Sequence, residues 1–161
     1  MKHHALAVAT CLLALTQSAF ANDPRATIQQ LEDRLAKMGA PRLEGTVDLK
    51  GKAVPAIFYG SRRINGNYDV VDEIKQNSGA TATVFVKDGD EFVRVSTNVL
   101  TPEGKRGVGT TLARAKAYEA VKVGKEYCGD VDVLGTPYTA CYRPIKQGAQ
   151  VIGVTYIGFK K

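Results

Sequence analysis

Arg94 is the residue of this chain whose type and position suggest binding chemistry most clearly. It lies near the end of a run, residues 81–96, in which side-chain type alternates on both sides of Asp88-Gly89. An Asp-Gly dipeptide between alternating segments is the strongest short-range signal of a β-hairpin. With a two-residue turn there, Phe85 lies opposite Phe92, and one hairpin face carries both rings, hydroxyl groups and the guanidinium. An aromatic surface with one permanent positive charge is suited to binding a small anion.

The charge of Arg94 allows two interpretations. If its face of the hairpin is enclosed, the guanidinium must meet a protein carboxylate or a ligand anion, because it cannot be neutralised. If that face is open, the head group extends into water while the stem packs on apolar surface. The first interpretation makes Arg94 a ligand-binding residue.

Tyrosines supply further hydrogen-bonding groups. Tyr138 and Tyr142 belong to a second predicted hairpin, around Leu134-Gly135, and alternation places both on a face that we expect to point inward. Tyr118 lies on the inward side of a helix predicted at residues 111–123. Such phenol groups either hydrogen-bond a ligand or pack with their hydroxyls at the rim of the core.

Two cysteines flank the Leu134-Gly135 turn. A turn centred there places Cys128 opposite Cys141 and Glu126 opposite Arg143, so two independent pairs agree on one register. A disulfide across this hairpin contributes about 3 kcal/mol in the chain-entropy model. The alternative is a redox function, but the spacing is not that of a Cys-x-x-Cys exchange site.

The elements that position these residues are strands interrupted by helices. Residues 24–38 read as an amphipathic helix with an Asp-Pro start, and the aliphatic face of the first hairpin is its natural partner. Strands at residues 43–59, a short helix at 68–76 and a final meander that ends near residue 159 complete the pattern. This order predicts an α+β fold with one antiparallel sheet and helices on its faces.

The first 21 residues read as an export signal. A lysine precedes an apolar run that is too short to span a bilayer, and Ala19-Phe-Ala21 is a small-x-small cleavage site. We therefore expect a mature protein of residues 22–161 that forms one domain in the periplasm or outside the cell. No later segment is apolar enough for membrane insertion.

Several function classes are disfavoured. The formal net charge of +6 is spread over interleaved basic and acidic residues, which indicates a solvated surface and no nucleic-acid partner. Both histidines lie in the signal segment, and there is no nucleophile, metal-ligand or catalytic motif, so we expect no enzyme activity, metal or cofactor. Residues 104–109 (GKRGVG) lack the ordered ending of a phosphate loop and are better explained as a tight crossover.

Five segments in order resemble single Cache sensory domains, in particular the fused Cache-three/Cache-two type. They are residues 65–72 (NGNYDVVD), 82–98 (ATVFVKDGDEFVRVSTN), 107–110 (GVGT), 142–145 (YRPI) and 151–154 (VIGV). The resemblance implies a PAS-like fold, with an N-terminal helix behind a central antiparallel sheet and connecting helices over a small-molecule pocket in front.

The resemblance also implies roles for individual residues. Related citrate and dicarboxylate sensors carry an Arg-Tyr-Ser-His motif whose arginine and histidine bind ligand carboxylates. Arg94-Val-Ser-Thr97 is similar to this motif, so Arg94 and Ser96 take the arginine and serine positions. Thr97 replaces the histidine, which argues against citrate-like ligands and for a monocarboxylate or another small polar ligand.

Together these patterns predict an exported, sensory-type domain that binds a small organic anion such as a carboxylate, with no output domain of its own and with a membrane-bound sensor as a candidate partner. The alternative is a periplasmic structural or interaction protein with a vestigial pocket. The candidate ligand-binding residues are Arg94, Ser96, Thr97, Tyr118, Tyr138, Tyr142, Phe85 and Phe92, and the candidate disulfide is Cys128–Cys141.

Overall fold

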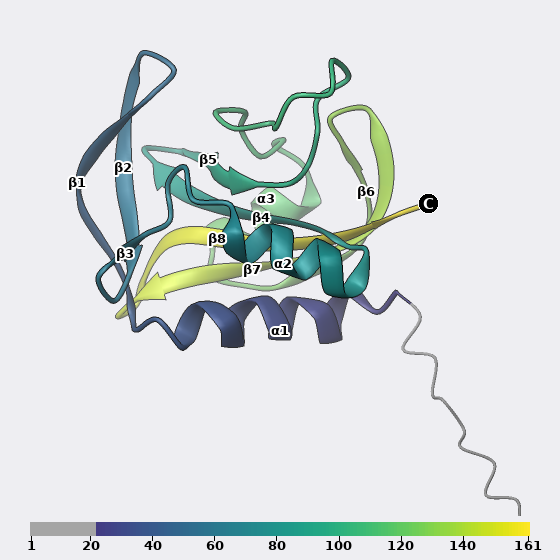
Figure 1. Cartoon of the computed structure of the whole chain (residues 1–161), viewed down its shortest axis with the longest axis horizontal. Coiled ribbons are helices and arrows are strands. Elements are labelled where there is room, and N and C mark those ends of the chain that lie inside the picture. Colours follow the sequence, from purple (N-terminus) through teal and green to yellow (C-terminus); the bar gives the residue numbers. More distant parts are fainter. Residues whose placement is uncertain (1–21) are drawn as a thin grey trace, which may run out of the picture.

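The computed structural model describes residues 22–161; the predicted export signal lies outside them. Their elements are α1 (Pro24–Ala36), β1 (Pro41–Leu49), β2 (Lys52–Tyr59), β3 (Arg62–Arg63), α2 (Asp69–Ser78), β4 (Thr81–Asp88), β5 (Glu91–Thr97), α3 (Lys116–Lys122), β6 (Tyr127–Val133), β7 (Thr136–Gln147) and β8 (Gln150–Lys160). The strands form two antiparallel sheets, ordered β1-β2-β3 and β5-β4-β8-β7-β6 (Figure 1). The α+β class is as predicted, whereas the prediction of a single sheet is wrong.

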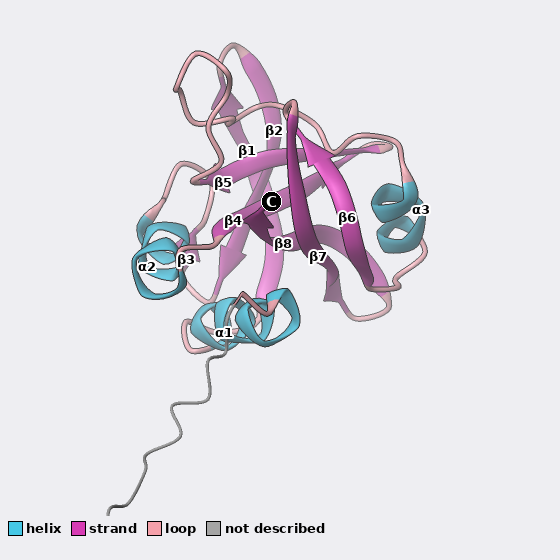
Figure 2. Cartoon of the chain, turned by 90° about the vertical axis from the view of Figure 1, so that its right-hand side faces the viewer, coloured by secondary structure: helices cyan, strands magenta, loops and turns pink. Residues whose placement is uncertain are grey.

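The five-stranded sheet separates two hydrophobic cores. On one face, α1, α2 and β2 pack against the valines of β4 and β5, as the alternation predicted for that face. On the other face lies an aromatic cluster that includes α3 and the inner sides of β7 and β8. Figure 2 shows α1 and α2 apart from α3, on different sides of the strands. Of the helices, α3 is therefore the one that covers the aromatic face.

Helix α1 forms where its sequence pattern places it. The Asp23 side chain caps its start by accepting a hydrogen bond from the Arg25 backbone amide at 2.9 Å. Ile28, Leu31 and Leu35, spaced three and four residues apart, are completely buried. The predicted helix at residues 24–38 is thus confirmed, with its last turn shortened to Ala36.

The β4–β5 hairpin exists, but its register differs from the prediction. Asp88 pairs with Glu91, so the two-residue turn is one position later than expected, and Phe85 lies opposite Arg94 instead of Phe92. A bulge then pairs Val84 with Ser96. The bulge adds one residue to β5 and turns the strand end relative to its partner. Ser96, two positions after Arg94, consequently lies on the opposite face of the sheet, opposite Val84.

The helix predicted at residues 111–123 is also shorter than expected. Its first part follows the free edge of β5: the Arg94 amide donates to the Thr110 carbonyl at 2.9 Å, and the Leu112 amide donates to the Phe92 carbonyl at 2.9 Å. Pairing with an open sheet edge satisfies backbone groups that a helical turn would otherwise use. Helix α3 therefore begins only at Lys116.

The β6–β7 hairpin has the predicted register. Cys128 pairs with Cys141 across it, and the two are joined by a disulfide. Leu134 and Gly135 both have positive φ, at 52° and 84°, as a tight hairpin turn of this type requires. The expected pairing of Glu126 with Arg143 is also present as an ion pair.

Candidate functional site

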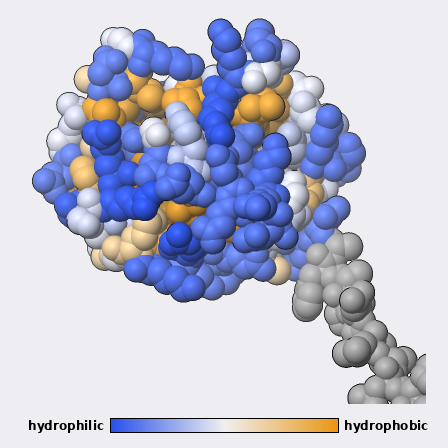
Figure 3. Space-filling view, viewed as in Figure 1, coloured by the Kyte–Doolittle hydropathy of each residue, from blue (hydrophilic) through white to orange (hydrophobic). Residues whose placement is uncertain are grey.

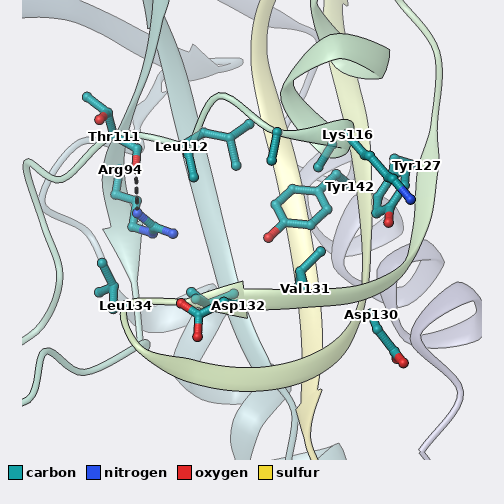
Figure 4. A pocket seen from close by; sticks show the side chains of 14 residues that line it. Arg94, Thr111, Leu112, Lys116, Tyr127, Asp130, Val131, Asp132, Leu134 and Tyr142 are labelled. Atoms are coloured by element: carbon teal, nitrogen blue, oxygen red, sulfur yellow. Dashed lines mark hydrogen bonds between the residues drawn. The ribbon is translucent and has the colours of Figure 1, made fainter.

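A cavity of about 460 Å³ opens on the aromatic side of the five-stranded sheet. It lies between Arg94 on β5, the segment that leads into α3, and the β6–β7 hairpin (Figure 4). Its lining residues are Arg94, Thr111, Leu112, Ala113, Ala115, Lys116, Ala117, Tyr127, Asp130, Val131, Asp132, Val133, Leu134 and Tyr142. Segments far apart in the sequence thus meet at one concave site.

Arg94 is the buried charged group of this cavity. Its relative exposure is only 4%. Its Nη1 donates to the Thr110 hydroxyl at 2.9 Å and to the Thr111 carbonyl at 3.1 Å. The guanidinium also lies over the Phe85 ring, 4.8 Å from its centroid. These contacts fix the side chain with its head group at the cavity.

Within residues 22–161 no carboxylate forms an ion pair with Arg94, and its Nε is buried without a hydrogen-bond partner. Burial lowers the pKa of Arg94, partly opposed by the neighbouring Tyr142 and Tyr156. Because a guanidinium starts from a very high pKa, it remains charged at neutral pH. The site therefore holds a positive charge that has donors to offer and no protein counter-ion.

Tyr142 faces Arg94 across the cavity. In Figure 4 its hydroxyl points toward the guanidinium side of the space. The residue is buried, its ring packs against Tyr156 with centroids 4.9 Å apart, and burial raises its pKa. A phenol in this state stays protonated and can donate a hydrogen bond to an anion that Arg94 holds.

Aliphatic side chains form most of the remaining walls. Leu112 is buried beside the aromatic cluster, and Val131 and Leu134 are partly buried against the same cluster. Leu134 comes from the β6–β7 turn and approaches Gly107, where an added Cβ would lie 2.9 Å from its Cδ1. This contact joins the turn to the loop that follows β5.

The charges at the rim include both signs. Lys116 and Tyr127 lie at the end away from Arg94 (Figure 4). Asp130 is held by Lys161 at 2.7 Å, which lowers the pKa of Asp130, and Asp132 accepts the Gly135 amide at 2.9 Å. Arg94 is accordingly the deep charged group, and the other charged side chains are exposed.

Of the eight predicted ligand-binding residues, Arg94 and Tyr142 line the cavity. Phe85 lies directly behind Arg94 as its stacking partner. Phe92 and Tyr118 pack edge to face with centroids 5.9 Å apart, and the Tyr118 hydroxyl donates to the Asp90 carbonyl at 2.7 Å. Tyr138 is buried in the same aromatic cluster. These four residues surround the site without lining it.

Ser96 and Thr97 lie elsewhere: the β5 bulge moves Ser96 to the other face of the sheet, and Thr97, opposite Thr83, lies farther along the strand than the cavity. The Ser96 hydroxyl donates to the Asn67 carbonyl at 2.6 Å, on the side of α2. Thr97 is completely buried and shares a 2.6 Å hydrogen bond with the Thr83 hydroxyl. Neither residue lines the cavity that Arg94 faces.

Sequence reasoning missed the segment around Thr110 and Leu112, which positions Arg94 and forms one wall. The helical spacing from Leu112 onward gave no signal of the pairing with the edge of β5, and the glycines of residues 104–109 mark only the loop before it. The amides of these glycines are used internally: Gly107 donates to Val99 at 2.9 Å and Gly109 donates to Arg94 at 2.8 Å. This bonding supports the crossover interpretation over a phosphate loop.

Among the described residues there is no group of three or more His, Cys, Asp or Glu side chains placed to hold a metal ion. In the same part of the chain, no helix has both the length and the apolar character needed to cross a membrane.

A family model described as the Cache 3/Cache 2 fusion domain matches residues 7–161. None of the curated proteins compared with the chain matches it.

Proposed function

Since the chain belongs to the Cache 3/Cache 2 fusion domain family, we propose that it is an exported, sensory-type domain that binds a small organic anion, such as a carboxylate, at Arg94. Cache domains are typically extracellular and bind ligands in a sensory role. The family membership gives this general function. The ligand class is inferred from the cavity.

The observation that carries the proposal is the environment of Arg94. A buried guanidinium normally has a carboxylate partner, because burying an unpaired charge is costly. Arg94 has none within residues 22–161, yet it borders a cavity of about 460 Å³. An anionic ligand that enters this cavity supplies the missing counter-charge, and Tyr142 adds a donor opposite the guanidinium.

A structural or interaction protein with a vestigial pocket is the second candidate. Such a pocket would be filled by side chains, and the open volume beside Arg94 therefore favours binding. We propose no catalytic role, because Lys116, Asp130 and Asp132 are exposed at the rim, and the deep part of the cavity combines one arginine with tyrosines and aliphatic residues.

The proposed function includes export of the domain from the cytoplasm. The predicted signal at residues 1–21 would deliver the domain to the periplasm or the exterior, and a disulfide between Cys128 and Cys141 is suited to an oxidising compartment. A membrane-bound sensor that reads the ligand-loaded form is a candidate partner.

The test is isothermal titration calorimetry of a carboxylate panel against the wild-type protein, Arg94→Gln and Arg63→Gln. Arg63 is exposed on β3 and does not line the cavity, so its variant controls for the loss of one positive charge. Binding that disappears in Arg94→Gln and persists in Arg63→Gln supports the proposal. Equal binding by Arg94→Gln, or no binding by the wild-type protein, overturns it.

A further inference from the structure

The cavity at Arg94 also indicates what kind of anion it takes. Resting on the function proposed above, we infer that the preferred ligand is a monoanion with an apolar or aromatic body, such as an aryl-substituted monocarboxylate, and not a dicarboxylate or tricarboxylate. The inference follows from three features of the lining: one deep charge, apolar walls, and rim charges that balance.

The first feature is that a single cationic side chain is buried at the cavity. Arg94 is 4% exposed, whereas Lys116, the other cation of the lining, is exposed. An exposed ammonium in water contributes little to binding a carboxylate, because solvent and salt screen it. The structure therefore provides one strong position for one anionic group.

The second feature is the apolar character of the walls between Arg94 and the rim. They are formed by Leu112, Ala113, Ala115, Ala117, Val131, Val133 and Leu134, together with the Tyr127 and Tyr142 rings. In Figure 4, Val131 and Leu112 approach the central space from opposite sides. Aliphatic and aromatic walls favour an apolar ligand body and leave the hydroxyl and the additional carboxylates of citrate without partners.

The third feature is the balance of charge around the cavity. At the rim, Lys116 and Lys161 balance Asp130 and Asp132, Asp130 being paired with Lys161 at 2.7 Å, and all four side chains are exposed. A monoanion adds one negative charge at the position of Arg94. A dianion or trianion would bring its extra charges to a rim without a buried cation, where they would lose hydration and gain only screened contacts.

The size of the cavity agrees with a ligand larger than a two-carbon acid. Its volume of about 460 Å³ lies within the range of sites that bind small organic molecules, roughly 300–1,000 Å³. Acetate would satisfy Arg94 and leave most of the apolar wall in contact with water. Each methylene group that replaces this water is expected to raise affinity about fourfold.

The experiment titrates the wild-type protein with acetate, butyrate, 3-phenylpropionate, the neutral 3-phenylpropionamide, succinate and citrate. We expect affinity to rise from acetate through butyrate to 3-phenylpropionate by at least about tenfold overall. The neutral amide should bind at least about tenfold more weakly than its acid, because it cannot neutralise the guanidinium. Succinate and citrate should bind no more tightly than acetate.

One variant tests the contribution of the apolar wall to affinity separately from the contribution of the charge. Val131→Thr keeps the branched shape on a strand and adds a hydroxyl to the wall. It should weaken 3-phenylpropionate about threefold or more while leaving acetate nearly unchanged. Thermal unfolding of both proteins confirms that the variant is folded, and Val123→Thr, at an exposed position outside the cavity, is the matched control.

The outcomes distinguish this inference from the proposed function. Tighter binding of succinate or citrate, weakened by Lys116→Gln, would overturn the inference and leave an anion-binding function at Arg94 intact. Affinity that does not depend on the size of the apolar body would overturn it in the same way. If no member of the panel binds, or if Arg94→Gln binds them all equally, both proposals fail.

Discussion

At the residue scale, the molecule contains one buried side chain, Arg94, whose unpaired charge is unfavourable for folding. Arg94 is buried, its Nε lacks an acceptor, and no carboxylate within residues 22–161 pairs with it. The two hydrogen bonds from its Nη1 and the stacking on Phe85 orient the guanidinium but do not neutralise it. We expect such a group to lower the stability of the ligand-free protein, because its charge is neutralised only when the ligand is bound.

Replacing Arg94 by methionine should therefore stabilise the ligand-free protein. We expect the free energy of unfolding of Arg94→Met to rise by about 1 kcal/mol, because an unpaired buried charge is exchanged for an apolar side chain of similar length. Urea denaturation measures the difference. Arg63→Met, at an exposed site, should change the free energy by less than about 0.5 kcal/mol. A loss of 2 kcal/mol or more in Arg94→Met would make the arginine a structural residue.

The pH dependence of binding should follow the ligand and not the protein. Arg94 remains charged, burial raises the pKa of Tyr142 so that its hydroxyl stays protonated, and residues 22–161 contain no histidine. Carboxylate affinity is thus expected to be constant from about pH 6 to 9 and to fall about tenfold per unit below the ligand's own pKa, near 4 to 5. Calorimetry at several pH values tests this. A transition between pH 6 and 8 would contradict it.

The residues of the site were only partly predictable from the sequence. Alternation identified Arg94 and Tyr142, because no bulge lies between either residue and the turn of its hairpin. Ser96 follows a bulge that the sequence does not signal, and the shift moves its hydroxyl to the Asn67 carbonyl. Leu112 could not be foreseen as a wall, because its helical spacing is overridden by pairing with the edge of β5.

At the element scale, the cavity is built from the edges of the five-stranded sheet. Strand β6 is its last strand and pairs only with β7, while residues 109–112 cover β5 at the other end. Such edges open more easily than the strands between them. The disulfide between Cys128 and Cys141 joins β6 to β7 one position away from Tyr127 and Tyr142, both of which line the cavity.

Removing the disulfide should weaken both stability and binding. For the double variant Cys128→Ser/Cys141→Ser, we expect the free energy of unfolding to fall by about 3 kcal/mol and carboxylate affinity to fall several-fold because the cavity wall loosens. Denaturation and calorimetry measure the two effects. Treatment of the wild-type protein with a reductant is the parallel control. Unchanged affinity would show that the wall is held independently of the disulfide.

The two hairpins show why some registers were predictable. For β6–β7, the cysteine pair and the pair of Glu126 with Arg143 specify the same alignment, and the structure has it. For β4–β5, only the Asp-Gly signal was available, and turns centred on residues 88–89 or 89–90 both separate the aliphatic face from the aromatic one. Side-chain pattern alone cannot choose between them.

At the scale of the whole molecule, the sheet carries the cavity on one face and α1 on the other. Arg143, next to Tyr142 on β7, reaches the opposite face, where it pairs with Glu32 of α1 at 2.9 Å and also with Glu126. Neighbouring residues of one strand thus contact the ligand site and the N-terminal helix. Figure 3 shows that the view of Figure 1 presents a largely hydrophilic surface, with apolar residues in separate small patches.

The overall architecture could be predicted from the sequence because α1 and the central strands have regular hydrophobic periodicity. The division into two sheets was not, because the strands at residues 41–63 have the same alternating character as the others, and sequence pattern does not specify which strands pair. The position of α2 beside α1, away from the cavity, could not be predicted from the sequence pattern either.

The proposed function depends on an anionic ligand that neutralises the buried charge of Arg94. A crystal structure of the protein with 3-phenylpropionate tests it most directly. We expect the carboxylate within hydrogen-bond distance of the Arg94 guanidinium and the Tyr142 hydroxyl, and the ring against Val131 and Leu134. A ligand bound elsewhere, with Arg94 hydrogen-bonded only to Thr110 and Thr111 as in the free protein, would contradict it.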